Sequence, residues 1–369
     1  MEFTEFIVRE NDNNRRIDKI LRRILPNSSL AALYKALRKG IIKVNQKKVS
    51  QDYLVITGDR ISVARFLTEQ NTNSEKNFPE HCPLIPVKPV TYRHSYTQEW
   101  TQADTPLLPI EDLFKNLHVR IINKPYNIAV QGGNGRETSL DSIITQDYFR
   151  EYGKQSLSFR PGPLHRLDKK TTGVLVFSQS LEGARWFSQA VQQHILKKEY
   201  VALVEGLVKE ALWEESISRD NSEQRGIKRQ KSYKTSTIDI QGKKARTYVK
   251  PLAYGHVGKK NVTLAHFVIE TGRTHQIRLH SSYHGHPLLG DTAYGGTSLK
   301  SVADADGGLS HKQLLFTQDF YLHAWKLSFP TPNPIDIPTT IEAPLPENFQ
   351  DILKIYLPDF SLKDYTMRV

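Results

Sequence analysis

The sequence predicts an α+β protein: a small N-terminal helical and β domain, then a larger mixed, mostly antiparallel β-sheet with flanking helices. Strand-like and helix-like apolar patterns follow one another without regular alternation, which disfavours a doubly wound fold. A proline-rich stretch separates two segments that each have their own apolar pattern. The 369 residues suit two or three domains of about 150 residues each, and a hydrophobic content of 38% is enough for folded cores.

The first segment, residues 1–66, has the pattern of a compact domain. Residues 15–25 place apolar side chains at helical spacing, with arginines on the other side. Ser28 or Ser29 can cap a second helix, which Gly40 would close. Two strands are predicted after this helix, residues 41–49 with a turn at Asn45-Gln46, and residues 58–66 after a Gly-Asp turn.

Positive charge is concentrated in this first segment. Residues 1–66 hold 14 Lys and Arg against 7 Asp and Glu, and the whole chain has a formal net charge of +12. A local excess of this kind points to a polyanion partner, nucleic acid before membrane, and a solubilising surface is the plainer alternative. If nucleic acid is the partner, we expect it to be bound by cations on the helices and the following strand, including Arg22, Arg38, Lys39 and Lys43.

Residues 67–110 are predicted to be a linker, because they contain six prolines and little periodicity. Cys82, the single cysteine of the chain, lies here, so an internal disulfide and a cysteine zinc cluster are excluded. No apolar run approaches the roughly 18 residues of a membrane-spanning helix, and the first residues lack a secretory signal pattern. We therefore expect a cytoplasmic protein that does not insert into a membrane.

The larger α+β domain is predicted to occupy residues 111–369. Apolar runs and alternation indicate several strands, and one long segment has apolar residues at helical spacing. The predicted strands are 119–125, 173–180, 198–208 and 261–270, and the predicted helix is 181–196.

Three polar side chains interrupt these apolar elements and are candidates for catalysis. Asp168 lies on a loop before a strand, where a rigid element can hold a reacting carboxylate, although a turn-capping aspartate is the more common explanation. Tyr200 shares a strand face with Ala202 and Val204, as a core tyrosine also would. Arg278 falls on a helix that Thr274 could cap, and it could pair with a carboxylate or a phosphate.

Metal and cofactor chemistry are not indicated by the sequence. His280 and His284 are four residues apart, as on a metal-binding helix, yet there is no HExxH motif and no cysteine partner. Phosphate-binding and nucleotide-binding loops are absent, because the stretch GGNGRET lacks the third glycine of GxGxxG. We therefore expect neither a metal nor a cofactor.

Taken together, these segments resemble the RluA-type family of pseudouridine synthases, closest to the RluC group. HRLDKKTTG, KKEYVALVEG and TGRTHQIRLH are similar to three motifs of the family, in the family's order. NKPYNIAVQGG, GHPLLGDTAYG and LHAWKLSFP match further segments. The N-terminal segment looks like the small α-L RNA-binding domain that many members carry. The resemblance covers nearly the whole chain outside the linker, and Thr172 stands where the family usually has serine.

The resemblance implies a role for each candidate residue. Asp168 corresponds to the catalytic aspartate, as nucleophile or as stabiliser of charge on the sugar, and Arg278 would keep it ionised and orient it. Tyr200 would stack on the target base and is the candidate for removing its proton. The base would have to be flipped into the pocket. Neighbouring motif residues would bind substrate: His165, Arg166, Thr172, Arg273 and His275.

We therefore expect an RNA pseudouridine synthase, an isomerase that acts as a monomer on large-subunit ribosomal RNA. The same chemistry on transfer RNA and a catalytically idle RNA-binding assembly factor are the alternatives. A metal-dependent nuclease that uses Asp168, Asp291 and the histidines is a further and weaker one. The segment 219–250, with ten Lys and Arg against three Asp and Glu, matches no family feature and could face RNA or be a solvated loop.

Overall fold

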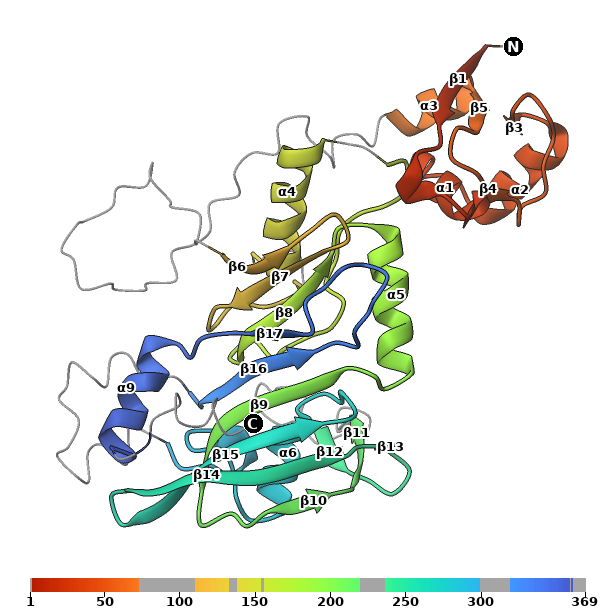
Figure 1. Ribbon diagram of the computed structural model, residues 1–369. Coiled ribbons are helices and arrows are strands. Elements are labelled where there is room, and N and C mark those ends of the chain that lie inside the picture. The colour runs from red at the N-terminus through yellow and green to blue at the C-terminus, as the bar shows by residue number, and fades with distance from the viewer. Residues whose placement is uncertain are drawn as a thin grey trace, which may run out of the picture.

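The computed structural model describes residues 2–72, 110–132, 138–153, 156–219, 236–298, 319–358 and 360. The first of these ranges is a separate small domain, at the upper right in Figure 1. Its elements are β1 (Phe3–Ile7), η1 (Glu10–Asp12), β2 (Arg15–Arg16), α1 (Ile17–Ile24), α2 (Leu30–Lys39), β3 (Ile42–Val44), β4 (Leu54–Val55), β5 (Arg60–Ala64) and α3 (Arg65–Thr72).

Local sequence signals account for this domain. The Ser29 hydroxyl accepts a hydrogen bond from the Ala32 backbone at the start of α2, and Gly40 ends the helix in the left-handed conformation, which confirms both predicted caps. Asn45 and Gln46 have positive φ and form the predicted turn after β3. The apolar faces of α1 and α2 pack on the sheet β1–β5–β3 in one buried core.

The first predicted boundary differs from the structure. Helix α3 continues directly from β5 and runs past Leu67, where the predicted linker begins. Leu67 packs against the core of the small domain, so this domain continues into the helix. Residues 73–109 of the predicted linker and half of the basic segment, 220–235, lie outside the described residues.

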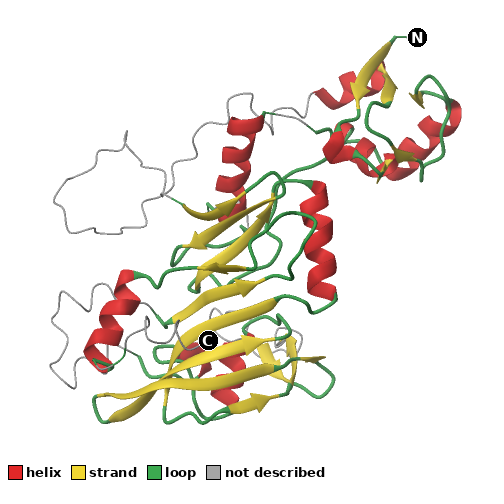
Figure 2. Ribbon diagram, viewed as in Figure 1, coloured by secondary structure: helices red, strands yellow, loops and turns green. Residues whose placement is uncertain are grey.

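The larger domain is built on a sheet of nine strands (Figure 2), and the predicted mixed, mostly antiparallel character of this sheet is confirmed. The order is β10–β14–β15–β9–β16–β8–β7–β6, with β17 beside β16, and only the β16–β8 pair is parallel. A separate three-stranded sheet has the order β12–β11–β13. The elements are β6 (Glu111–Lys115), β7 (Val119–Lys124), α4 (Leu140–Tyr152), β8 (Thr172–Ser178), α5 (Leu181–Gln192), β9 (Lys197–Glu205), β10 (Ala211–Trp213), β11 (Ser216–Arg219), β12 (Ser236–Ile238), β13 (Lys243–Lys244), β14 (Thr247–Val257), β15 (Lys260–Ile269), α6 (Gln276–Tyr283), η4 (Thr292–Tyr294), β16 (Leu322–Ser328), β17 (Thr340–Glu342) and α9 (Glu347–Tyr356).

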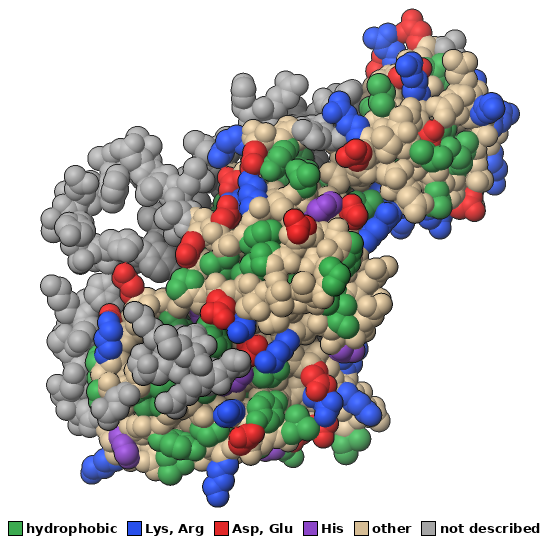
Figure 3. All heavy atoms as spheres, in the orientation of Figure 1, with side chains coloured by type: hydrophobic (Ala, Val, Ile, Leu, Met, Phe, Trp, Pro, Cys, Tyr) green, Lys and Arg blue, Asp and Glu red, His purple; other side chains and the backbone are tan. Residues whose placement is uncertain are grey.

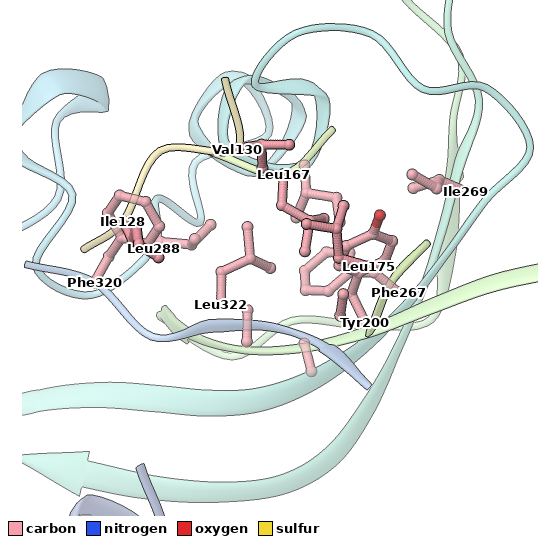
Figure 4. Close-up of a cluster of buried hydrophobic side chains, with 14 of the residues drawn as sticks. Ile128, Val130, Leu167, Leu175, Tyr200, Phe267, Ile269, Leu288, Phe320 and Leu322 are labelled. Atoms are coloured by element: carbon pink, nitrogen blue, oxygen red, sulfur yellow. The ribbon is translucent and has the colours of Figure 1, made fainter. Parts of the chain in front are cut away.

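Strand β9 shows how the sheet separates two cores. Tyr200, Ala202 and Val204 point into one apolar cluster, part of which is drawn in Figure 4. Val201 and Leu203 point into a second cluster on the opposite face, which α9 covers. The predicted alternation of this strand is therefore confirmed, and it places the Tyr200 ring on a rigid, buried element.

Strand β16 lies at the centre of the large sheet, between β9 and β8. Its contact with β8 is close, because a β-carbon on residue 173 would lie 2.1 Å from the carbonyl oxygen of Ala324. Gly173 also has a φ of +109°, so only glycine fits at this point. The first residues of β8 therefore pack closely against a strand that comes about 150 residues later in the chain.

A buried polar junction joins the two domains. The carboxylate of Asp12 is fully buried and accepts hydrogen bonds from the backbone N–H groups of Leu157 and Ser158, at 2.8 and 3.0 Å. The hydroxyls of Ser156 and Ser158 donate to it as well. Arg15 donates to the Ser158 hydroxyl. Both oxygens of the Asp12 carboxylate thus accept hydrogen bonds from across the interface.

Candidate active site

Asp168 lies on the loop before β8. Hydrogen bonds from a buried lysine stabilise this loop. The Nζ of Lys124 donates to the carbonyl oxygens of Pro125, Lys169 and Thr171 at 2.8–2.9 Å. Burial lowers the pKa of Lys124 to about 7, against the opposing charge of Asp168. The sequence analysis did not single out this lysine, although a lone cation at the end of an apolar strand was a visible signal.

Arg278 on α6 fixes the position of the Asp168 carboxylate. Its Nη1 donates to Oδ2 of Asp168 at 3.1 Å, while Nε and Nη2 donate to the two oxygens of Asp291 at 2.6 and 2.8 Å. The guanidinium also lies over the rings of Tyr294 and Phe320, at 4.9 and 4.5 Å from their centroids. Burial lowers the pKa of Arg278, but hydrogen bonds and charge from both aspartates raise it overall, so the guanidinium remains charged.

Tyr200 enters the same pocket from β9. Its side chain is buried, and it belongs to the apolar cluster around Leu167 and Leu322 (Figure 4). Burial raises the pKa of Tyr200, and the charge of Asp168 raises it further. The phenol is therefore protonated at neutral pH, and its ring presents an apolar surface beside the carboxylate.

His275 is the second cationic or donor group near Asp168. Its Nε2 lies 3.6 Å from Oδ1 of Asp168, and its Nδ1 lies 2.9 Å from the hydroxyl of Tyr294. The predicted cap at Thr274 is wrong: His275 is the residue before α6, with φ of 55°, and no side chain caps the helix. This left-handed conformation turns the histidine ring toward the carboxylate, where a capping residue would face the helix end.

These residues line one pocket, together with two cations. Arg166 is exposed and forms no ion pair with any described residue, whereas Arg273 donates to the Lys244 carbonyl. A larger cavity of about 240 Å³ lies around Arg120 and Glu151, but its charged groups are paired with one another. The pocket at Asp168 is lined by Arg166, Leu167, Asp168, Thr171, Tyr200, Ile269, Arg273, His275, Gln276, Ile277, Arg278 and Leu322.

Two residues expected to bind substrate do not line this pocket. His165 accepts a hydrogen bond from the Val176 backbone and stacks on Phe187, and burial lowers its pKa to about 3. Thr172 is buried, and its hydroxyl is 2.8 Å from Nδ1 of His323, whose Nε2 faces a carbonyl. Both side chains make hydrogen bonds within the protein, next to the loop that carries Asp168. Neither is therefore proposed to contact the substrate.

The cations predicted to bind nucleic acid in the small domain lie on its surface. Arg22, Arg38 and Lys39 are exposed, and Lys43 is half-buried with its ammonium over the Phe3 ring. Figure 3 shows Lys and Arg side chains distributed around this domain. They are separate from the pocket that holds Asp168.

The histidines of α6 are engaged elsewhere. His280 Nδ1 lies 3.0 Å from the Thr247 hydroxyl, and His284 lies 2.9 Å from Glu215 and stacks on Trp213. Both oxygens of Asp291 accept from Arg278. In the described part of the chain, no group of three metal-ligating side chains is arranged to hold an ion, and no helix is long and apolar enough to cross a membrane.

Comparison with known proteins agrees with this arrangement. The model of the RNA pseudouridylate synthase family matches residues 118–283, and that of the S4 domain matches residues 15–61. Ribosomal large subunit pseudouridine synthase D of Nitrosomonas europaea is 30% identical, over 95% of this chain and 87% of that protein. Ribosomal large subunit pseudouridine synthase C of Escherichia coli (strain K12) is 25% identical, over 93% of both chains.

The fold is also found among solved structures. Human RNA Pseudouridylate Synthase Domain Containing 4 superposes with a TM-score of 0.50 at 20% identity, over 66% of this chain and 92% of that chain. At this identity the likeness shows the fold alone. The sequence match to a relative over nearly the whole chain goes further, and it agrees with the motif resemblance: this protein belongs to the RNA pseudouridylate synthase family, whose members are isomerases, and carries an N-terminal S4 domain.

Proposed function

We propose that this protein converts uridine to pseudouridine in large-subunit ribosomal RNA, with Asp168 as the catalytic carboxylate. The observation that supports this most directly is the pairing of Asp168 with Arg278 at 3.1 Å, beside the buried ring of Tyr200. Relatives that match the chain over 87% or more of their length are named ribosomal large subunit pseudouridine synthases. Their names support the choice of substrate.

The isomerisation breaks the bond between ribose C1′ and uracil N1, turns the base, and joins C1′ to C5. A proton leaves C5, and N1 takes up a proton in exchange. An ionised carboxylate at C1′ can act as a nucleophile or stabilise positive charge on the sugar. Arg278 donates to Oδ2 of Asp168 and leaves Oδ1 without a hydrogen bond to any described residue. Atoms and electrons balance within the nucleotide, so the reaction needs no external oxidant or reductant.

Tyr200 contributes a flat apolar surface to this reaction. Because its pKa is raised by burial and by Asp168, the phenol would have to lose its own proton before it could accept one from C5. We therefore assign it to stacking on the uracil ring and to donating a hydrogen bond. Stacking on an aromatic side chain is worth about 1–3 kcal/mol per base.

RNA reaches the pocket through positive charge on two parts of the protein. Arg166 and Arg273 lie at the pocket, where they can contact phosphates next to a flipped nucleotide. The exposed cations of the S4 domain, Arg22, Arg38 and Lys39, supply further phosphate contacts at a distance from the site. Because these contacts are electrostatic, we expect RNA affinity to fall as the salt concentration rises.

Tritium release from RNA labelled at uridine C5 tests the proposal. Ribosomal RNA and transfer RNA from cells that lack this protein are offered separately, to wild type and to Asp168→Asn. Release from ribosomal RNA by wild type alone is the expected result. Release from transfer RNA only would overturn the assignment of ribosomal RNA as the substrate. RNA binding without tritium release from either RNA would favour a catalytically idle binding factor.

A further inference from the structure

We propose that Tyr294 selects the ring tautomer of His275, so that the Nε2–H of His275 faces Oδ1 of Asp168 and positions the carboxylate. This inference rests on the proposed function of Asp168. His275 acts here as a positioning residue, because it holds the group that reacts.

The hydrogen bonds around the Tyr294 hydroxyl determine the direction of donation. The backbone N–H of Ser236 donates to the phenol oxygen at 2.9 Å, and Nδ1 of His275 lies 2.9 Å from the same oxygen. The hydroxyl has one hydrogen, and within the described residues His275 Nδ1 is its acceptor. If Nδ1 carried the proton instead, the hydroxyl hydrogen would be left without an acceptor in a largely buried place.

A neutral imidazole carries one N–H, so a Nδ1 that accepts from Tyr294 puts the proton on Nε2. Burial lowers the pKa of His275, and the charge of Arg278 lowers it further, against the opposing charges of Asp168 and Asp291. The ring is therefore neutral at pH 7. Its Nε2–H points toward Asp168, and the opposite tautomer would direct a lone pair at the carboxylate.

The distance between the two groups fits a contact that tightens during the reaction. Nε2 of His275 is 3.6 Å from Oδ1, which is longer than a hydrogen bond, whereas Arg278 already holds Oδ2 at 3.1 Å. Hydrogen bonds in unliganded active sites are often long and shorten when substrate binds. A small rotation of the Asp168 carboxylate in the bound state would bring Oδ1 within reach of Nε2–H.

One short segment, residues 291–294, positions the side chains of Arg278 and His275, which lie beside Asp168. Asp291 aligns Arg278, and Tyr294, three residues later, aligns His275. The segment turns tightly, because a β-carbon on Gly296 would lie 2.2 Å from the Leu288 carbonyl oxygen. The 291–294 segment therefore supports the carboxylate from two sides without touching it.

The first test is Tyr294→Phe, which removes the hydroxyl and keeps the ring. We expect kcat for tritium release to fall about tenfold with little change in KM, as for the loss of one hydrogen bond at a transition state. Tyr283→Phe is the matched control, since Tyr283 is exposed on α6, and it should leave the rate unchanged. A rate for Tyr294→Phe equal to that of wild type would overturn the proposal.

We call the series Tyr294, His275 and Asp168 the relay. A double-mutant cycle distinguishes this relay from a general structural role of Tyr294. The amide of His275→Gln can donate from the position of Nε2 without help from Tyr294, so Tyr294→Phe should cost little in that background. Two independent, additive losses would contradict the relay. Nitrogen-15 NMR of histidine-labelled protein provides a readout without substrate: His275 should show the Nε2–H tautomer in wild type and lose that preference in Tyr294→Phe. An Nδ1–H tautomer in wild type would refute the relay even if pseudouridine formation proved to be a wrong assignment.

Discussion

Two aspartates of this protein, Asp12 and Asp168, show how surroundings decide what a carboxylate does. Asp12 is fully buried at the domain junction, and backbone and hydroxyl donors of residues 156–158 surround it. Asp168 has a side chain that is 24% exposed, one guanidinium on Oδ2, and Oδ1 facing His275 at 3.6 Å. A carboxylate that accepts hydrogen bonds on both oxygens stabilises the fold, whereas one that keeps an oxygen without a hydrogen bond can meet a substrate.

The largest expected effect is on Asp168. Asp168→Asn keeps the shape of the side chain but removes its charge, so we expect tritium release to fall by about 10³-fold or more. The unfolding free energy should change little, because the side chain is partly exposed and makes few bonds. Rate measurements paired with urea titrations check this, and a large loss of stability would mean that Asp168 is structural after all.

Asp291→Ala should impair both activity and stability. It leaves the Arg278 guanidinium buried with Asp168 as its remaining carboxylate, which typically costs about 3 kcal/mol, and the loss of alignment should lower kcat about 10²-fold. Asp291→Asn retains one acceptor oxygen and should recover part of both losses. Unchanged kcat in the alanine variant would show that Arg278 needs no alignment.

The reverse pattern is expected at the junction. Asp12→Ala leaves the N–H group of Leu157 without its acceptor and leaves the N–H of Ser158 with the Ser156 hydroxyl alone, at a cost of about 1–3 kcal/mol in unfolding free energy. Turnover on a short RNA that reaches only the pocket should stay the same. Glu10→Ala, an exposed carboxylate on the same 3-10 helix, is the control and should be neutral in denaturant titrations. Reduced turnover on the short RNA would mean that the junction also shapes the pocket.

The last prediction concerns a smaller change per pH unit, at Lys124, a buried cation that supports the loop of Asp168. Its pKa falls from 10.5 to about 7 on folding, so between these values the unfolded chain binds more protons than the native protein. Stability should therefore rise with pH above about 7, by at most about 1.4 kcal/mol per pH unit from this group. The slope should be absent in Lys124→Met, which unfolding curves at several pH values would reveal. Equal slopes in the two proteins would argue against the lowered pKa.

Local patterns predicted much of the fold and the residues that meet in the pocket, but not the side chains that support them. The caps at Ser29 and Gly40 and the alternation around Tyr200 depend on neighbours in sequence, so they could be read directly. Asp12 and Lys124 are buried by partners far along the chain, and no local pattern distinguishes such a charge from an exposed one.

The predicted cap at Thr274 failed for a related reason. A threonine hydroxyl before a helix can accept a capping hydrogen bond. Here, however, the backbone at His275 is left-handed, and no side chain caps the helix. Asp168, Tyr200 and Arg278 were proposed from a motif resemblance, and the structure brings them to one pocket. The ion pair of Asp291 with Arg278 could not be predicted from local sequence, since the two residues lie on different elements.

The central position of β16 has a consequence for how the enzyme is made. Asp168 precedes β8 and Tyr200 lies on β9, and in the described sheet these two halves are joined only through β16. The three residues proposed for catalysis all precede Leu279 in the chain, yet the strand that unites the halves begins at Leu322. If these residues react as proposed, we expect a chain that ends before β16 to contain all three without holding them in one pocket, and therefore to lack isomerase activity.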